Sequence, residues 1–259
     1  MGVRRQVVEK QLRSVYPELT DAELVSLRTE VYDALGRTAA EVLCTDLAKT
    51  ATEVEVVPGW DSVDRALAGG KGGIVATGHL GNFELGGAVL AGRYPLLDVV
   101  KTQRNRAFDR FLQRRRHALG IETVTMDHSI RPVLRQLRRG GLVSLLVDQD
   151  AGGSGVATDF LGLPASTWPG AARIALHTGC PVIPMAITRT VGGGHRLRIG
   201  EPVQAPGEGE NEVRVREYTS RISRAFEQYV LAEPAQWFWV HRRWKGAAEA
   251  KGTHEKQQV

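Results

Sequence analysis

Between residues 60 and 199, short apolar segments of strand length alternate with segments of helical periodicity. Strands are expected at residues 74–77, 97–100, 142–147, 182–187 and 197–199, and helices at residues 61–68, 85–91, 108–118, 130–137 and 170–177. Such alternation is typical of helices packed on both faces of a largely parallel sheet. The sequence therefore predicts an α/β fold.

Two helices are expected before this region. The first ends at Pro17, and the second begins with a capping-box pattern in which Thr20 and Glu23 can each satisfy an orphan backbone amide. A later helix, with Tyr218 and Phe226 on its apolar stripe, is expected to pack on the core.

A chain of 259 residues can bury one sizeable core, so we expect a single domain. It should span residues 1–246, with an N-terminal helical part at 1–40 and the α/β core at 60–246. The polar stretch at 247–259 is expected to be a disordered tail, and Gly152 to Gly155 a loop after a strand.

Charge and cysteine content narrow the function classes. Lys and Arg number 34 against 29 Asp and Glu, and the excess is locally concentrated, which favours an anionic partner such as an anionic lipid, an acidic carrier protein or nucleic acid. Cys44 and Cys180 both stand in apolar sequence and are expected to be buried, so no disulfide framework or CxxC motif is predicted. Because no apolar run reaches about 18 residues, a soluble or membrane-peripheral protein is expected.

The segment from Thr77 to Glu84, TGHLGNFE, carries the sharpest chemical signal. A buried strand leads into a glycine-flanked turn that contains His79, and Glu84 follows five positions later. If His79 lies at or before the N-terminal cap of the next helix, Glu84 can pair with one imidazole nitrogen and leave the other to take a proton from a hydroxyl. The alternative is a satisfied core histidine and a carboxylate that interacts with a helix dipole.

Two further polar groups follow apolar or turn-like sequence. Asp148 and Asp150 end an apolar strand, so they are expected at the carboxyl edge of the sheet beside His79, either holding a basic residue or binding an acceptor hydroxyl, or else capping loop amides. Thr167 and Arg173, at the start of the next helix, are candidates for an acyl or phosphate site and equally for a helix N-terminus.

The segment from Lys101 to Arg116 contains seven Lys and Arg residues against one acidic residue, Asp109. It predicts either a solvated helix face or a surface that binds lipid phosphates or an acidic carrier protein. Near the end of the chain, three Trp stand beside four basic residues between Trp237 and Lys245. This segment predicts either interfacial membrane contact or a terminal strand packed into the core.

Motifs in the same order resemble the late acyltransferases of lipid A biosynthesis. GHLGNFE looks like the H-x4-D/E motif of glycerolipid and lipid A acyltransferases, with Asn82 and an aromatic residue before Glu84. The other similar stretches, between about residues 4 and 245, are Pro17–Leu19, Leu35–Thr38, Asp148–Asp150, Phe160–Gly170, Thr178–Pro184 and Pro234–Lys245. Lys101 departs from the pattern, because many relatives carry Arg before a proline there, whereas Asn105 matches.

The resemblance implies an O-acyltransferase with a glycerolipid acyltransferase-like α/β fold. The expected reaction moves a fatty acyl chain from an acyl carrier protein or CoA thioester to a hydroxyl of a membrane glycolipid, most simply a lipid A precursor. His79 and Glu84 would be catalytic, with no metal or cofactor. Substrate-binding roles would fall to Asn82, Lys101, Arg104, Asn105, Asp148, Asp150, Thr167 and Arg173.

Other acceptors and other activities remain open. A phosphoinositide mannoside or an amino lipid could replace the lipid A precursor, and a thioesterase or lipid hydrolase could use the same His–Glu pair on water. No GxSxG elbow is present, and no nucleic-acid motif supports nucleic-acid binding, which is not expected. The protein is expected at the cytoplasmic face of the bacterial inner membrane, attached peripherally.

Overall fold

A computed structural model describes residues 3–128 and 130–245, and its main sheet confirms the predicted α/β class. Within these ranges the sheet has seven strands, in the spatial order β1 (Glu55–Val57), β9 (His195–Ile199), β8 (Val182–Arg189), β2 (Gly73–Thr77), β5 (Leu142–Leu146), β3 (Leu96–Val100) and β4 (Ile121–Thr125). All neighbours pair in parallel except β8 and β9, which form an antiparallel hairpin. The carboxyl ends of β2 and β5, two adjacent central strands, therefore lie at the same edge of the sheet.

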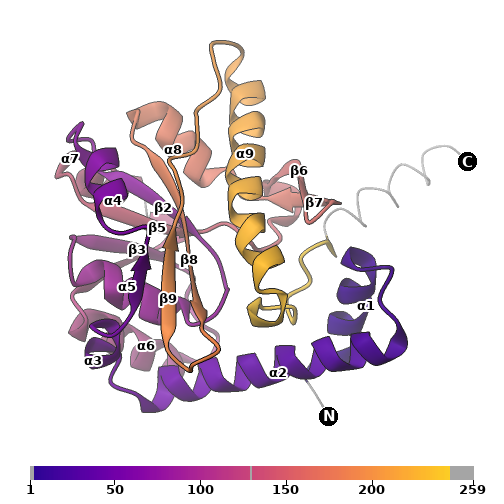
Figure 1. Cartoon of the computed structure of the whole chain (residues 1–259). Helices are drawn as coiled ribbons and strands as arrows, with labels where there is room; N and C mark the ends of the chain where they lie inside the picture. Colours follow the sequence, from indigo (N-terminus) through magenta and orange to yellow (C-terminus); the bar gives the residue numbers. More distant parts are fainter. Residues whose placement is uncertain (1–2, 129, 246–259) are drawn as a thin grey trace, which may run out of the picture.

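Helices cover both faces of this sheet (Figure 1). They are α3 (Leu47–Ala51), α4 (Asp61–Leu67), α5 (Phe83–Ala91), α6 (Arg106–Ala118), α7 (Ile130–Arg138), α8 (Gly170–Thr178) and α9 (Asn211–Ala232). Alternate side chains of β2 point to opposite faces, as strand geometry requires: Ile74 packs with α7, α8 and α9, and Val75 packs with α4 and α5. The predicted stripe of α9 is buried, including Tyr218 and Phe226.

Two N-terminal helices precede the sheet. In α1 (Arg5–Val15) and α2 (Asp21–Cys44), the predicted capping box is present, since the Thr20 hydroxyl accepts from the Glu23 amide and the Glu23 carboxylate accepts from the Thr20 amide. Figure 1 shows α2 as one long helix along a side of the molecule. Cys180 is buried as expected, but the expectation for Cys44 was wrong, because this residue is exposed at the last turn of α2.

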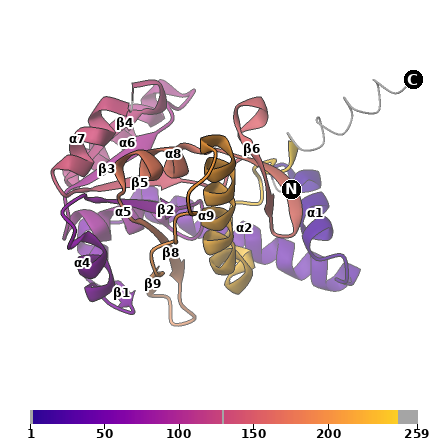
Figure 2. The ribbon, with the colours of Figure 1, turned by 90° about the horizontal axis from the view of Figure 1, so that it is seen from above.

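Several strands were not predicted. After a short 3₁₀ turn, η2 (Gly152–Ser154), which falls within the predicted loop, β6 (Val156–Phe160) and β7 (Leu163–Thr167) form an antiparallel hairpin. Figure 2 shows this hairpin away from the main sheet, toward α1. The edge strands β1 and β4 were also missed, since β1 is three residues long and Ile121 is the one buried residue of β4.

The tryptophan-rich end belongs to the core rather than to an exposed surface. After a 3₁₀ turn, η3 (Pro234–Gln236), both Trp237 and Trp239 are buried, and they pack with Phe160 and Trp244. The segment forms one isolated bridge between Trp237 and Leu80 instead of a regular strand. The predicted disordered tail at 247–259 lies outside the described residues.

Candidate active site

The turn between β2 and α5 presents His79 at the sheet edge. Asn82 is the N-cap of α5, and its side-chain oxygen accepts from the Leu85 amide, so His79 lies before the cap. Gly81 has φ +57°, and a Cβ there would come within 2.2 Å of the Ile187 carbonyl oxygen. Only glycine can therefore close this turn against β8.

His79 is held by Asp148, which follows β5. The imidazole Nδ1 lies 2.9 Å from one Asp148 oxygen, and the backbone amide of His79 donates to the other at 2.8 Å. The indole Nε1 of Trp237 also donates to that second oxygen at 2.8 Å. Burial raises the pKa of Asp148, but the charge and hydrogen bonds of His79, with the bond from Trp237, outweigh it and leave the pKa below its ordinary value. Asp148 is thus an ionised acceptor.

This arrangement fixes the tautomer of His79. An ionised carboxylate can only accept, so Nδ1 carries the proton and Nε2 is left with a lone pair. The side-chain nitrogen of Gln149 lies 3.2 Å from Nε2 and donates to it. The His79 side chain is 17% exposed whereas that of Asp148 is 1% exposed, so the basic nitrogen faces the accessible side of the pair.

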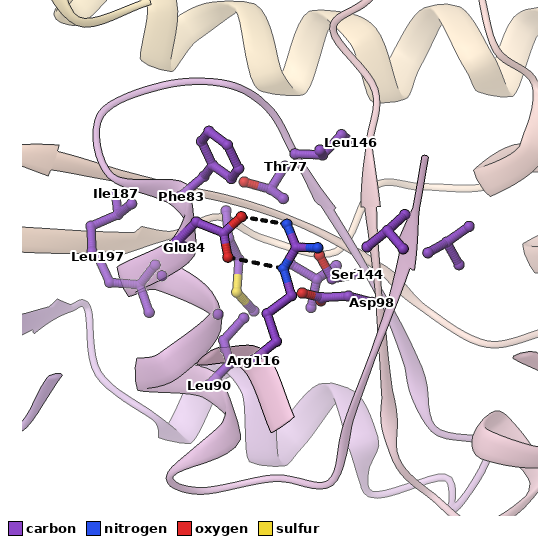
Figure 3. Close-up of a pocket in the computed structure, with 16 residues that line it drawn as sticks. Thr77, Phe83, Glu84, Leu90, Asp98, Arg116, Ser144, Leu146, Ile187 and Leu197 are labelled. Atoms are coloured by element: carbon purple, nitrogen blue, oxygen red, sulfur yellow. Dashed lines mark hydrogen bonds and ion pairs between the residues drawn. The ribbon is translucent and has the colours of Figure 1, made fainter. Parts of the chain in front are cut away.

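Glu84 does not pair with His79, and that prediction was wrong. Both of its oxygens accept from Arg116 of α6, with a distance of 3.0 Å from the Arg116 Nε to one of them (Figure 3). Glu84 lies in the first turn of α5 and is buried, and its carboxylate points toward the Arg116 guanidinium. The five-residue spacing therefore places His79 and Glu84 on opposite sides of the turn.

Arg116 and Glu84 line a cavity of about 40 Å³ between the sheet and α5. Asp98 of β3 also lines it, and its Oδ1 is buried with no hydrogen-bond partner among the described residues. Burial, and then the charge of Glu84, raise the pKa of Asp98 to about 7, against a smaller opposing effect of Arg116. The rest of the lining is mostly apolar, with Phe83, Leu90, Leu146, Met185 and Leu197 among it.

The C-terminal segment closes over the His79 turn. The Phe238 amide donates to the His79 carbonyl at 3.0 Å, and the Gly81 amide donates to the Gln236 carbonyl at 3.0 Å. Rings of Phe83 and Phe238 flank the imidazole, with centroids 5.0 and 5.7 Å away. These contacts leave His79 little freedom to change rotamer.

The other candidate residues are divided between the site and structural roles. Asp150 follows Gln149, and its amide donates to Nε2 of a second, partly buried histidine, His241. Thr167 is buried and bonded to Thr158 and Arg243, and Arg173 forms an exposed ion pair with Glu212. The structure thus places Asp148 against His79, pairs the backbone of Asp150 with that of Thr167, and engages Arg173 in an exposed ion pair.

The residues after β3 stay on the surface. Lys101, Arg104 and Asn105 are exposed, and the Asn105 side chain caps α6 by accepting from the Ala107 and Phe108 amides. They belong to the loop that leaves the same carboxyl edge of the sheet as His79.

Helix α2 braces the turn from outside. Glu41 accepts from the Asn82 side chain at 2.9 Å and from Arg189 of β8 at 2.6 and 2.7 Å. Thr38 donates to the Gly81 carbonyl at 3.3 Å. Asn82, expected to bind substrate, is thereby engaged in holding the turn.

Sequence reasoning missed Arg116, Gln149, Glu41 and the indole of Trp237 as parts of this site. Gln149 had a signal, because it stands between two aspartates at the end of an apolar strand. Arg116 was counted in a cationic surface patch, and only its burial distinguishes it from its neighbours.

Within residues 3–128 and 130–245, no group of three or more His, Cys, Asp or Glu side chains is placed to hold a metal ion. In the same ranges, no helix has the length and apolar character needed to cross a bilayer.

Comparisons with known proteins converge on one family. The family described as bacterial lipid A biosynthesis acyltransferase matches residues 1–246. A phosphatidylinositol mannoside acyltransferase of Mycobacterium tuberculosis is 27% identical over 237 residues, which are 89% of this chain and 73% of the relative. The lipid A biosynthesis palmitoleoyltransferase of Escherichia coli is 24% identical over 250 residues, 93% of this chain and 79% of the relative. The lauroyltransferase of the same organism is 23% identical, over 96% of this chain and 81% of its own length.

Proposed function

We propose that this chain, which belongs to the bacterial lipid A biosynthesis acyltransferase family, transfers a fatty acyl chain from a thioester to a hydroxyl of a membrane glycolipid with His79 as the general base. The observation that carries the proposal is the hydrogen bond of Asp148 to Nδ1 of His79, which leaves Nε2 as a proton acceptor on the accessible side. A base in this position contributes about 10²- to 10⁴-fold to the rate.

The reaction follows from this geometry. Nε2 takes the proton of the acceptor hydroxyl while the hydroxyl oxygen attacks the thioester carbonyl, and Asp148 stabilises the imidazolium that forms. The tetrahedral intermediate then expels the thiolate, which receives the proton from His79 and leaves as a thiol. Because a thioester is already activated, the proposed reaction uses no metal or cofactor.

Gln149 donates to the same nitrogen that must accept the hydroxyl proton. Its amide therefore stands where the acceptor hydroxyl binds, and the side chain turns away when that hydroxyl enters. Glu84 acts at a distance in this proposal: through Arg116 it fixes α5 and α6 below the turn.

The acceptor is proposed to be a lipid A precursor, supported by the family and by the names of the Escherichia coli relatives. The phosphatidylinositol mannoside acyltransferases among the relatives support a mannosylated phosphoinositide as the alternative. An acyl carrier protein or CoA carries the donor chain, and the protein works as a peripheral protein at the cytoplasmic face of the inner membrane.

The test is acyl transfer followed by the mass of the lipid product. Purified protein is incubated with acyl carrier protein and CoA thioesters of several chain lengths and with each class of acceptor in mixed micelles. We expect the acceptor mass to rise by one acyl chain, and we expect His79→Ala and Asp148→Asn each to lower the rate by about 10²-fold or more.

The variants must remain folded for this comparison, so circular dichroism and thermal unfolding are measured beside activity. Glu212→Gln, which removes half of an exposed ion pair outside the site, is the matched control and should keep full activity. Wild-type activity in His79→Ala, or release of free fatty acid in place of acylated lipid, contradicts the proposal.

A further inference from the structure

The large exposed apolar side chains are unevenly distributed. In the part of the chain that the structure describes, the exposed Phe, Met, Ile and Trp residues are four: Phe108 is 41% exposed, Met126 42%, Ile130 57% and Trp168 39%. The remaining exposed large apolar residues in these ranges are Val and Leu scattered over other elements. Scattered single residues need no explanation, but a gathering of the largest ones does.

All four lie at the carboxyl edge of the parallel sheet. Phe108 is in the first turn of α6, which follows β3; Met126 comes directly after β4; and Ile130 begins α7. Trp168 follows Thr167, which pairs in an isolated bridge with Asp150 beyond the end of β5. This is the edge at which His79 and Asp148 are placed.

Basic residues surround these positions. Lys101, Arg104, Arg106 and Arg110 are exposed in the loop after β3 and on α6, and Arg131 is exposed beside Ile130. Among the described residues none of these five takes part in an ion pair, and the carboxylates in the same segments are Asp109 and Asp127. The edge therefore carries an excess of positive charge.

We propose that this carboxyl-edge patch, defined by Phe108, Met126, Ile130 and Trp168 with the five basic residues around them, lies against an anionic bilayer. The inference rests on the proposed function, because it supplies the route by which a lipid acceptor reaches His79 without leaving the membrane. The tryptophan-rich end was the earlier candidate for membrane contact, but Trp237 and Trp239 are buried. The carboxyl-edge patch takes its place as the proposed membrane-contacting surface.

The side-chain types favour a bilayer over an acidic protein as the occupant. Trp side chains prefer the headgroup region of a bilayer, and Ile, Met and Phe insert between the headgroups and the acyl chains. Lys and Arg bind anionic headgroups. Each basic residue near an anionic surface contributes about fivefold to membrane partitioning, and this contribution is lost at high salt. The apolar residues extend from four separate segments, which suits a flat, fluid surface.

The experiment is vesicle flotation of the full chain without donor or acceptor. Vesicles of phosphatidylcholine alone are compared with vesicles containing phosphatidylglycerol, at low and high salt. We expect wild type to float with the anionic vesicles, the pair Phe108→Ser and Ile130→Ser to lose about tenfold or more in partitioning, and the pair Arg110→Gln and Arg131→Gln to lose the dependence on phosphatidylglycerol.

Matched controls are Val191→Ser and Leu231→Ser, which remove exposed apolar side chains elsewhere and should float like wild type. Asp148→Asn should also float like wild type, so a failure of catalysis and a failure of membrane contact give different results. Patch variants that float as well as the controls overturn the inference. If they float normally but turn over acyl carrier protein thioesters more slowly, the patch binds the acidic carrier instead, and the bilayer proposal is wrong.

Discussion

Asp98 lines the same cavity as the ion pair between Glu84 and Arg116. Arg116 bonds to both oxygens of Glu84, and Asp98 keeps one oxygen without a partner among the described residues. Burial and the neighbouring charge of Glu84 raise the pKa of Asp98 to about 7. The folded protein therefore holds a proton on Asp98 that the unfolded chain releases near pH 4.

Replacing Asp98 by Asn should remove a pH dependence of stability. Between about pH 4 and 7 the native state binds one more proton than the unfolded state, so the free energy of unfolding falls as pH rises, by about 4 kcal/mol in total. Asn carries no proton to lose. We expect the melting temperature of Asp98→Asn, relative to wild type, to be several degrees higher at pH 8 than at pH 5.

The measurement is thermal unfolding of both proteins across this range. Asp127→Asn, a change at an exposed aspartate, is the control and should follow wild type at every pH. An offset between Asp98→Asn and wild type that stays constant with pH would mean that Asp98 is ionised throughout.

Single residues were predicted unevenly from sequence. The turn around His79 was foreseen because glycines on both sides of a histidine after an apolar strand have few structural uses. Asp148 was expected beside His79, but Glu84 was named as the partner of the imidazole, because the choice between the two carboxylates depends on which side of the turn each occupies. Arg116 decides that choice by binding Glu84 from another helix.

At the scale of elements, α2 links the His79 turn to strand β8. Glu41 joins three elements, since it accepts from Asn82 at the start of α5 and from Arg189 at the end of β8. Burial alone raises the pKa of Glu41, but its bonds to Arg189 and Asn82 outweigh it, so the pKa is lowered and the residue is ionised at neutral pH.

Glu41→Ala should destabilise the protein and slow catalysis together. The substitution leaves the largely buried Arg189 without its carboxylate, which costs about 3 kcal/mol, and releases the Asn82 side chain. We expect a lower melting temperature and a lower kcat with little change in KM, because the turn rather than substrate binding is disturbed.

Asp33→Ala is the control on the same helix, since its ion pair with Arg37 is exposed. It should lower stability by about 0.5 kcal/mol at most. Equal effects of the two substitutions would show that α2 does not brace the turn.

Strands that are buried on both faces of the sheet were predicted well from the sequence. The central strands β2, β5 and β8 are apolar on both faces and were predicted. In contrast, β4 is an edge strand that contains the polar residues Glu122 and Thr123, and such a sequence does not distinguish a strand from a loop. The β6–β7 hairpin buries one face only. The glycine-rich segment before it was predicted as a loop, and the two strands that follow were not predicted.

At the scale of the whole molecule, α1 contacts the segment that follows α9. Gln11 of α1 donates to the carbonyls of Trp239 and His241 and accepts from the Arg243 amide. The segment that it holds is the one whose Trp237 indole reaches Asp148. Helix α1 therefore supports the site without touching it.

Gln11→Ala should loosen this segment. Three backbone groups, two of them buried and one partly buried, lose their partner, at a cost of about 2 to 3 kcal/mol in unfolding free energy. We expect faster hydrogen exchange between residues 236 and 243 and a reduced rate of acyl transfer.

Ser14→Ala removes an exposed hydroxyl from the same helix and serves as the control. Hydrogen exchange in the segment that is no faster in Gln11→Ala than in this control would show that α1 is dispensable for the site.

The pairing of Trp237 with Leu80 also has a consequence for synthesis of the protein. The ribosome synthesises the His79 turn early and the segment that contacts it late. The Phe238 amide, which bonds to His79, and the Trp237 indole, which bonds to Asp148, are translated after every strand of the sheet. A nascent or prematurely terminated chain that stops before Trp237 has His79 and Asp148 but lacks the Phe238 amide bonded to the His79 carbonyl and the indole bonded to Asp148. Translation through this segment is therefore what completes the hydrogen bonds around His79 and Asp148.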